Sequence, residues 1–260
     1  MRTRVILACF ACLPMLAARA AQTPTVSPAP SPARVLFIGN SLTIANDLPA
    51  TVAALARAAG RSVTTDTVAF NNFSLEDHWQ QGESRRRIAR GGWSFVVLQQ
   101  GPSALPESQV LLREFTKRFD EDIRNAGAKT ALFMVWPSKA RFGDFDGVSR
   151  SYTNAATDVS GVLVPAGDAW RAAWKRDPAL ALYGPDDFHP STAGSYLAAL
   201  VMVRRLFDVS PIGLPAPGIP APIAKLLQET VGLAPGSEDP GLRTTLLFAP
   251  GRRPGMSFPR

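Results

Sequence analysis

Apolar residues along the chain gather in short, β-branched runs that alternate with longer amphipathic stretches. The strand-like runs cover residues 34–38, 62–70, 93–98, 130–136 and 162–164. The stretches with helical spacing cover residues 47–59, 106–126, 148–159, 168–175 and 193–206. This regular alternation predicts an α/β fold, in which helices cover both faces of a parallel sheet.

The two ends of the chain differ in composition from this alternating middle. Residues 1–20 combine a basic start, an apolar core and the small-x-small site Ala18-Arg19-Ala20, which is the pattern of a secretory signal peptide. We expect cleavage near Ala20, followed by a Pro/Ser-rich spacer over residues 21–33. The apolar core is too short to span a bilayer, so we expect a secreted or periplasmic protein without stable membrane insertion.

Residues 211–260 are rich in proline and glycine and contain one short amphipathic stretch, residues 223–231. We interpret this segment as a C-terminal extension and not as a second domain, because its composition does not support a core of its own. The chain is therefore expected to form one domain over residues 34–210.

Cysteine content and charge narrow the chemistry. Both cysteines, Cys9 and Cys12, lie inside the predicted signal, so a mature chain has no disulfide, thiolate nucleophile or cysteine metal site. The formal charge of +7 includes three arginines of the signal, which leaves a mild +4 after cleavage. Arginines gather within residues 85–90 without interleaved aromatic residues, so we expect a solvated helix face and no nucleic-acid partner.

The first strand-like run ends in Gly39-Asn40-Ser41. A parallel strand that stops there delivers a side chain to the carboxyl edge of the sheet, where open α/β sheets bind their ligands. Ser41 is therefore a candidate nucleophile. The alternative is that Ser41 only caps the following helix.

A second candidate segment lies far downstream, where Asp186 and His189 precede an apolar helix. An acid and a histidine three residues apart can meet across one tight turn. The carboxylate would then hold the imidazole tautomer while the other ring nitrogen faces a serine hydroxyl. This arrangement supplies the base that a serine nucleophile needs.

From residue 34 to residue 207 the chain resembles the SGNH (GDSL) hydrolase superfamily, and in particular an exported bacterial branch whose first block reads Gly-Asn-Ser-Leu-Thr, as residues 39–43 do here. The last block of the family, Asp-x-x-His, matches Asp186 and His189. The resemblance implies that Ser41 is the nucleophile. It also implies a flavodoxin-like three-layer α/β/α sandwich with a five-stranded parallel sheet.

The second block departs from the family pattern. The family places a glycine amide in the oxyanion hole, whereas residues 71–74 contain no glycine. Because that donor is a main-chain group, the amide of Asn72 or Phe73 can still supply it.

The third block departs as well, since Gln99, Gln100 and Ser103 stand where the family has an asparagine. A glutamine amide is also a donor, one methylene longer. We therefore expect Gln100 to complete an oxyanion hole with the amides of Ser41 and Asn72, and Gln99 is the next choice.

Other hydrolase chemistries lack their motifs. The sequence contains neither Gly-x-Ser-x-Gly nor His-Glu-x-x-His, and its two histidines are His78 and His189. We therefore expect no metal and no cofactor. His78 is expected either to pack in the core or to line the cleft, where it would contact substrate together with Gln99 and Ser103.

These observations favour a serine esterase that hydrolyses short acyl esters, with acetylated carbohydrate as one candidate substrate, through an acyl-enzyme. The expected partner is thus a small-molecule or polysaccharide ester. The alternative is a non-catalytic envelope or carbohydrate-binding protein on a degenerate fold, which the two substituted blocks favour.

Overall fold

The computed structural model describes residues 32–232. The predicted signal peptide, nearly all of the spacer and residues 233–260 of the extension lie outside the described residues. No helix within residues 32–232 is both long and apolar enough to cross a membrane.

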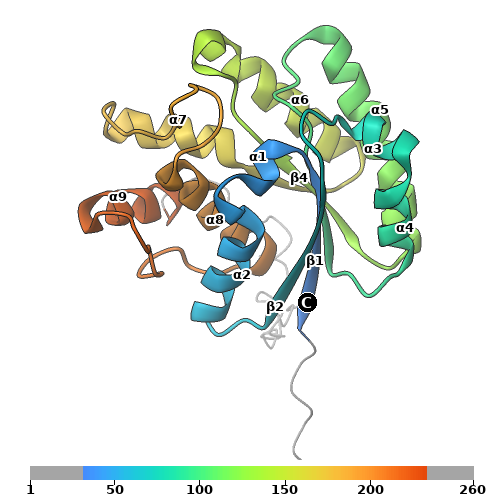
Figure 1. The fold of residues 1–260 in the computed structure, drawn as a ribbon, viewed down its shortest axis with the longest axis horizontal. Coiled ribbons are helices and arrows are strands. Elements are labelled where there is room, and N and C mark those ends of the chain that lie inside the picture. The colour runs from blue at the N-terminus through green and yellow to red at the C-terminus, as the bar shows by residue number, and fades with distance from the viewer. Residues whose placement is uncertain (1–31, 233–260) are drawn as a thin grey trace, which may run out of the picture. The chain divides into compact units, whose positions relative to one another are not determined.

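One five-stranded sheet forms the middle layer of the described chain (Figure 1). Its strands are β1 (Ala33–Gly39), β2 (Val63–Ala69), β3 (Phe95–Leu98), β4 (Lys129–Met134) and β5 (Val162–Pro165). They follow the order β2-β1-β3-β4-β5, and every neighbouring pair is parallel. This strand order is that of the flavodoxin-like doubly wound fold, so the predicted fold class is confirmed.

Helices cover both faces of the sheet (Figure 1). On one face lie α2 (Leu48–Ala58), α7 (Ala166–Arg176), α8 (Thr192–Phe207) and α9 (Ala221–Gly232). On the other face lie α3 (Leu75–Gln81), α4 (Glu83–Ala89), α5 (Pro106–Asn125) and α6 (Phe145–Asp158). Three short helical segments complete the described part: α1 (Ser41–Ile44), η1 (Ala45–Asp47) and η2 (Lys139–Asp144).

The central strand β1 shows why the sequence forms this sandwich. Val35 and Phe37 enter the hydrophobic cluster on the α8 side, while Leu36 and Ile38 enter the cluster on the α5 side. All four side chains are fully buried. A strand that is buried on both faces reads as a continuous apolar run, as residues 35–38 do.

The strand order also determines where a ligand can bind. The chain crosses to one side of β1 to form β2 and then returns to the other side to form β3. Loops that leave the carboxyl ends of β1 and β3 therefore diverge, and open α/β sheets bind ligands in the crevice between such loops. Ser41 follows β1 and Gln100 follows β3, so both lie at this edge.

Candidate active site

Ser41 is the first residue of α1, directly after β1. The helix is capped by Asn40, whose Oδ1 accepts a hydrogen bond from the Leu42 amide at 3.1 Å. The capping role considered for Ser41 thus belongs to its neighbour. The Ser41 hydroxyl is left to interact with another part of the chain.

The residues around Ser41 fix the end of β1 against the end of β3. A Cβ atom on Gly39 would lie 2.2 Å from Thr43 Oγ1 and 2.5 Å from Gln99 Oε1, so only glycine fits there. Gln99 Oε1 accepts hydrogen bonds from the Asn40 amide at 2.9 Å and the Thr43 hydroxyl at 2.7 Å. The Gly-Asn-Ser-Leu-Thr sequence is therefore a structural unit, in which Asn40 and Thr43 both bind to Gln99.

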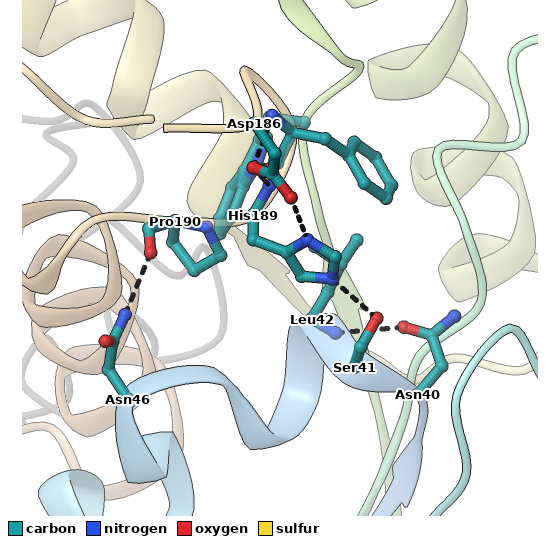
Figure 2. A network of polar contacts seen from close by, with 9 residues as sticks. Asn40, Ser41, Leu42, Asn46, Asp186, His189 and Pro190 are labelled. Atoms are coloured by element: carbon teal, nitrogen blue, oxygen red, sulfur yellow. Dashed lines mark hydrogen bonds and ion pairs between the residues drawn. The ribbon is translucent and has the colours of Figure 1, made fainter. Parts of the chain in front are cut away.

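Ser41, His189 and Asp186 form a continuous hydrogen-bonded chain (Figure 2). His189 Nε2 lies 2.8 Å from Ser41 Oγ, and His189 Nδ1 lies 2.5 Å from Asp186 Oδ2. The other carboxylate oxygen of Asp186 accepts the amides of Phe188, at 3.1 Å, and His189, at 2.9 Å. The tight turn expected from the spacing of Asp186 and His189 is thus present, and it meets Ser41.

Hydrogen bonding also controls the charge state of Asp186. The bond from the His189 imidazole, reinforced by the Phe188 amide, lowers the pKa of Asp186 from its ordinary 3.8 to about 2. The carboxylate is therefore ionised near neutral pH. It accepts a hydrogen bond from His189 Nδ1 and so favours the tautomer with the proton on that nitrogen. In this tautomer Nε2 presents its lone pair to Ser41, which is the geometry of a general base.

A cleft of about 460 Å³ opens beside Ser41. Asn72 and Phe73 contribute to one part of its lining, Gln100 and Ser103 to another, and Phe188 also lines it. Most of the remaining lining residues are apolar or carry hydroxyl groups. The cleft therefore presents apolar walls and a few polar groups, which is typical of a small-molecule site.

Ser41 and Asn72, whose main-chain amides were expected to form an oxyanion hole, both line the cleft. Among the described residues, neither the Ser41 amide nor the Asn72 amide has a hydrogen-bond acceptor, whereas the Phe73 amide donates to the Phe70 carbonyl at 3.2 Å. Asn72 has φ of +62°, a left-handed conformation that favours glycine but that asparagine tolerates. Asn72 thus has a backbone conformation that glycine commonly adopts, and its amide, unlike that of Phe73, has no acceptor among the described residues.

Gln100 lines the cleft, but its side chain is already engaged. Its Oε1 accepts the Leu75 amide at 3.2 Å, and its Nε2 donates to Ser103 Oγ at 3.0 Å and to the Ser108 carbonyl at 3.2 Å. The Ser103 hydroxyl donates in turn to the Gly101 carbonyl at 2.9 Å. To stabilise an oxyanion, Gln100 would have to release one of these bonds.

His78 and Gln99 do not lie where contact with substrate would require. Both side chains are fully buried and neither lines the cleft. His78 Nε2 donates to the Gly39 carbonyl at 2.8 Å, so its Nδ1 accepts the Ser84 hydroxyl at 3.0 Å. Burial lowers the pKa of His78 and favours this neutral form. The expectation that His78 and Gln99 contact substrate is therefore corrected: both brace the end of β1.

Sequence reasoning assigned no role in the site to Asn40, Asn46 or Arg141. Asn40 could have been found, because an asparagine before a short helix is a capping signal. Asn46 bonds to residues more than a hundred positions away, which no local pattern shows. Arg141 lies in η2, pairs with Asp144 and lines the cleft.

Among residues 32–232, no group of three or more His, Cys, Asp or Glu side chains is arranged to bind a metal ion.

Comparisons with known proteins agree with this geometry at the level of the fold. No family model matches the chain, and no curated protein matches it. A protein from Slackia heliotrinireducens assigned to the SGNH hydrolases is 26% identical with a TM-score of 0.59, and the match covers 68% of this chain and 100% of that one.

Two further solved structures match with lower identity. A DUF4886 family protein from Bacteroides uniformis is 20% identical, with a TM-score of 0.65 and coverage of 78% and 94%. An acetyl xylan esterase from Geobacillus stearothermophilus is 16% identical, with a TM-score of 0.53 and coverage of 67% and 94%. The fold class is that of the flavodoxin-like hydrolases. The fold and the similarity to solved SGNH hydrolases, GDSL-type lipases and acetyl xylan esterases support the predicted resemblance to the SGNH (GDSL) hydrolase superfamily.

Proposed function

We propose that the protein is a serine esterase that hydrolyses short acyl esters through an acyl-enzyme on Ser41. The observation that carries this proposal is the hydrogen-bonded chain from Asp186 through His189 to Ser41, which ends beside the cleft. A serine hydroxyl is a weak nucleophile unless an oriented base accepts its proton, and His189 is placed to do so.

In the proposed reaction, Ser41 Oγ attacks the ester carbonyl while its proton moves to His189 Nε2. Asp186 stabilises the imidazolium that forms. The tetrahedral intermediate collapses when His189 gives that proton to the leaving alcohol, which departs and leaves an acyl group on Ser41. A water molecule then transfers a proton to His189 and attacks the acyl carbonyl. When the second tetrahedral intermediate collapses, His189 returns that proton to Ser41 Oγ, which restores the serine and releases the carboxylic acid.

The amides of Ser41 and Asn72 would donate to the oxyanion, because both are without an acceptor among the described residues. A fixed donor of this kind contributes about 2.7–4 kcal/mol to transition-state stabilisation. Gln100 would be a third donor only if its Nε2 left Ser103 or Ser108. Two amides and a conditional third donor are therefore the proposed oxyanion hole.

The proposed substrate is an acetyl or other short acyl ester, with acetylated carbohydrate as the first polymer to try. A similar fold occurs in an acetyl xylan esterase, which supports this choice of substrate. The aromatic rings of Phe73 and Phe188 at the cleft can pack against a sugar face or a short acyl chain.

A non-catalytic binding protein is the second candidate function, and the bonds made by Gln100 favour it. In that case the hydrogen-bonded chain would be intact, but oxyanion stabilisation would be too weak for turnover. Turnover of an activated ester by the wild-type protein that is absent in the serine variant would exclude this candidate.

The test is hydrolysis of a chromogenic acetate ester by wild-type, Ser41→Ala and His189→Ala proteins. We expect a loss of kcat of at least about 10³-fold in either variant, because the two residues act as one unit. Ser210→Ala is the matched control, since Ser210 is exposed and does not line the cleft. Equal rates for wild type and Ser41→Ala would overturn the proposal.

We also propose that the protein is exported as a soluble enzyme after removal of residues 1–20. The supporting pattern is in the sequence alone. Mass spectrometry of the exported protein should find Ala21 at its amino terminus, whereas an intact Met1 would contradict export by signal cleavage.

A further inference from the structure

The reaction requires two distant segments to stay in register. Ser41 and His189 are 148 residues apart, and their side chains must remain within hydrogen-bonding distance. Ser41 lies at the start of a four-residue helix, while His189 lies in an irregular segment between α7 and α8. Neither element is long enough to fix this distance by itself.

The histidine segment, residues 182–191, is held in its conformation by internal hydrogen bonds. The Gly184 amide donates to the His189 carbonyl at 2.7 Å, and the Ser191 amide donates to the Leu182 carbonyl at 2.8 Å. On the β4 side, Trp136 Nε1 donates to the Phe188 carbonyl at 3.0 Å. These bonds determine the conformation of the histidine segment and attach it to the end of β4. None of them reaches the serine segment, residues 41–47, which contains α1 and η1.

Asn46 makes that connection (Figure 2). Its Nδ2 donates to the Pro190 carbonyl at 2.9 Å and to Ser195 Oγ at 2.8 Å. Asn46 lies in η1, directly after the helix that begins with Ser41, and Pro190 directly follows His189. Both amide hydrogens of Asn46 therefore tie the serine segment to the residue beside the base and to α8.

The backbone at Asn46 supports a specific role for this side chain. Asn46 has φ of +51° and ψ of +30°, which is a left-handed conformation inside η1. Non-glycine residues occupy this region at a cost, so they persist where other contacts hold them. Asp47 has the same φ, but its side chain makes no cap hydrogen bond. The two neighbours thus share a backbone conformation and differ in side-chain contacts.

We propose that Asn46 is a positioning residue that sets the distance between Ser41 Oγ and His189 Nε2. It acts through Pro190 and Ser195 and does not contact substrate. This inference rests on the proposed function, since its catalytic consequence requires Ser41 and His189 to react. Misplacement of a reacting pair by about 1 Å can cost about 10²-fold in rate.

Two substitutions isolate the amide. Asn46→Gly keeps a left-handed conformation without strain and removes both hydrogen bonds. Asn46→Asp keeps the shape but places a carboxylate oxygen against the Pro190 carbonyl, where a donor is needed. We expect both to lower kcat by about 10- to 100-fold while KM changes by less than about twofold. Asp47→Gly is the matched control, with the same φ and wild-type kcat expected.

A readout on the imidazole separates positioning from general destabilisation. The chain has two histidines, so the ¹⁵N resonances of His189 can be assigned by comparison with His189→Gln. In Asn46→Gly we expect the Nε2 shift to move toward its value in Ser41→Ala, because the bond from Ser41 is lost. The Nδ1–H resonance should remain, because Asp186 still accepts it.

Wild-type kcat and an unchanged Nε2 shift in Asn46→Gly would overturn the inference. A loss of kcat that Asp47→Gly shares to the same extent would also overturn it, since the backbone flexibility that glycine adds would then be the cause. Equal rates for wild type and Ser41→Ala would instead refute the proposed function. The Nε2 shift would then still decide whether Asn46 holds the two segments together.

Discussion

At the residue scale, the carboxylate of Asp186 orients the His189 imidazole although 54% of the Asp186 side chain is exposed to solvent. Three hydrogen bonds compensate for this exposure: one from the imidazole and two from main-chain amides of the same turn. Hydrogen bonds to the ionised form hold its pKa at about 2. The orientation of His189 therefore does not depend on burial of the pair.

Replacing Asp186 with asparagine tests this orientation. Asparagine keeps the shape, but its amide does not favour a proton on Nδ1, so the imidazole can turn its protonated nitrogen toward Ser41. We expect kcat to fall by about 10³- to 10⁴-fold. Asp187→Asn is the matched control, because Asp187 pairs with Lys139 at 3.1 Å, and it should stay within about threefold of wild type in the same assay.

The pKa of Asp186 also predicts a pH dependence. The folded value of about 2 lies below the ordinary 3.8, so the bond to His189 adds stability above pH 3.8 and loses it as the pH falls toward 2. Urea unfolding between about pH 5 and about pH 2 should show a steeper loss of stability in wild type than in Asp186→Asn. Parallel curves for the two proteins would contradict this assignment.

His78 leads to a second pH dependence of stability, at a higher pH, because its imidazole is buried and uncharged. Burial lowers its pKa below the ordinary 6.5, so the unfolded chain takes up a proton at a higher pH than the folded one. Stability is then fully present above pH 6.5 and falls as the pH drops below it.

The measurement is the free energy of unfolding in urea at about pH 7.5 and about pH 5.5, for wild type and His78→Gln. Wild type should lose more stability between the two conditions than the variant, which has no imidazole at this position. An equal loss would show that His78 takes up no proton on unfolding in this range.

At the element scale, the segment that supplies the Asn72 amide is held by the start of α3. Ser74 Oγ accepts the Asp77 amide at 3.2 Å, and the Ser74 amide donates to Asp77 Oδ2 at 2.8 Å, so the two residues form a capping box. Ser74 also lines the cleft. The capping box thus begins α3 and also holds the chain close to Asn72.

Ser74→Ala removes this cap and should lower the free energy of unfolding by about 0.5–2 kcal/mol. Ser74→Thr keeps a hydroxyl acceptor and should recover most of the loss. Thermal unfolding followed by circular dichroism gives the comparison, with an expected shift of about 2–4 °C per kcal/mol for a chain of this size. Equal transitions for the two variants would mean that the hydroxyl does not stabilise α3.

The sequence predicted two kinds of element well. All five strands follow from short apolar runs, and the helices α2, α5, α6, α7 and α8 follow from amphipathic stretches of helical spacing. The short helical segments α1 and η2 were not foreseen, because four to six residues are too few to show the helical spacing of apolar residues. They are nevertheless the elements that present Ser41 and Arg141 to the cleft.

The candidate site likewise contains residues that local patterns predict and residues that depend on distant partners. Ser41, Asp186 and His189 were predictable because their chemistry depends on residue type and on one local spacing. The placement of Gln99 depends instead on the Asn40 amide, 59 residues away, and that of His78 on the Gly39 carbonyl, 39 residues away. Partners at such separations are set by strand pairing, which one sequence does not show.

At the scale of the whole molecule, the segment after residue 210 is attached to the sandwich through α9. Leu227 and Val231 are buried in the same hydrophobic cluster as α8. Gln228 is buried as well, and its side chain donates to the Tyr196 hydroxyl at 2.8 Å and to the Leu214 carbonyl at 2.8 Å. A domain that ends at residue 210 would therefore leave this part of α8 uncovered.

Two deletions decide how far the folded unit extends. Removing residues 211–260 exposes the α8 surface under Leu227 and Val231, and each such aliphatic side chain contributes about 1.5–3 kcal/mol when fully buried. Removing residues 233–260 leaves every described contact of α9 in place. We expect the longer deletion to lower the urea midpoint or abolish folding, and the shorter one to match wild type. If both deletions unfold like wild type, the stable domain ends at residue 210, and α9 is bound to the sandwich without stabilising it.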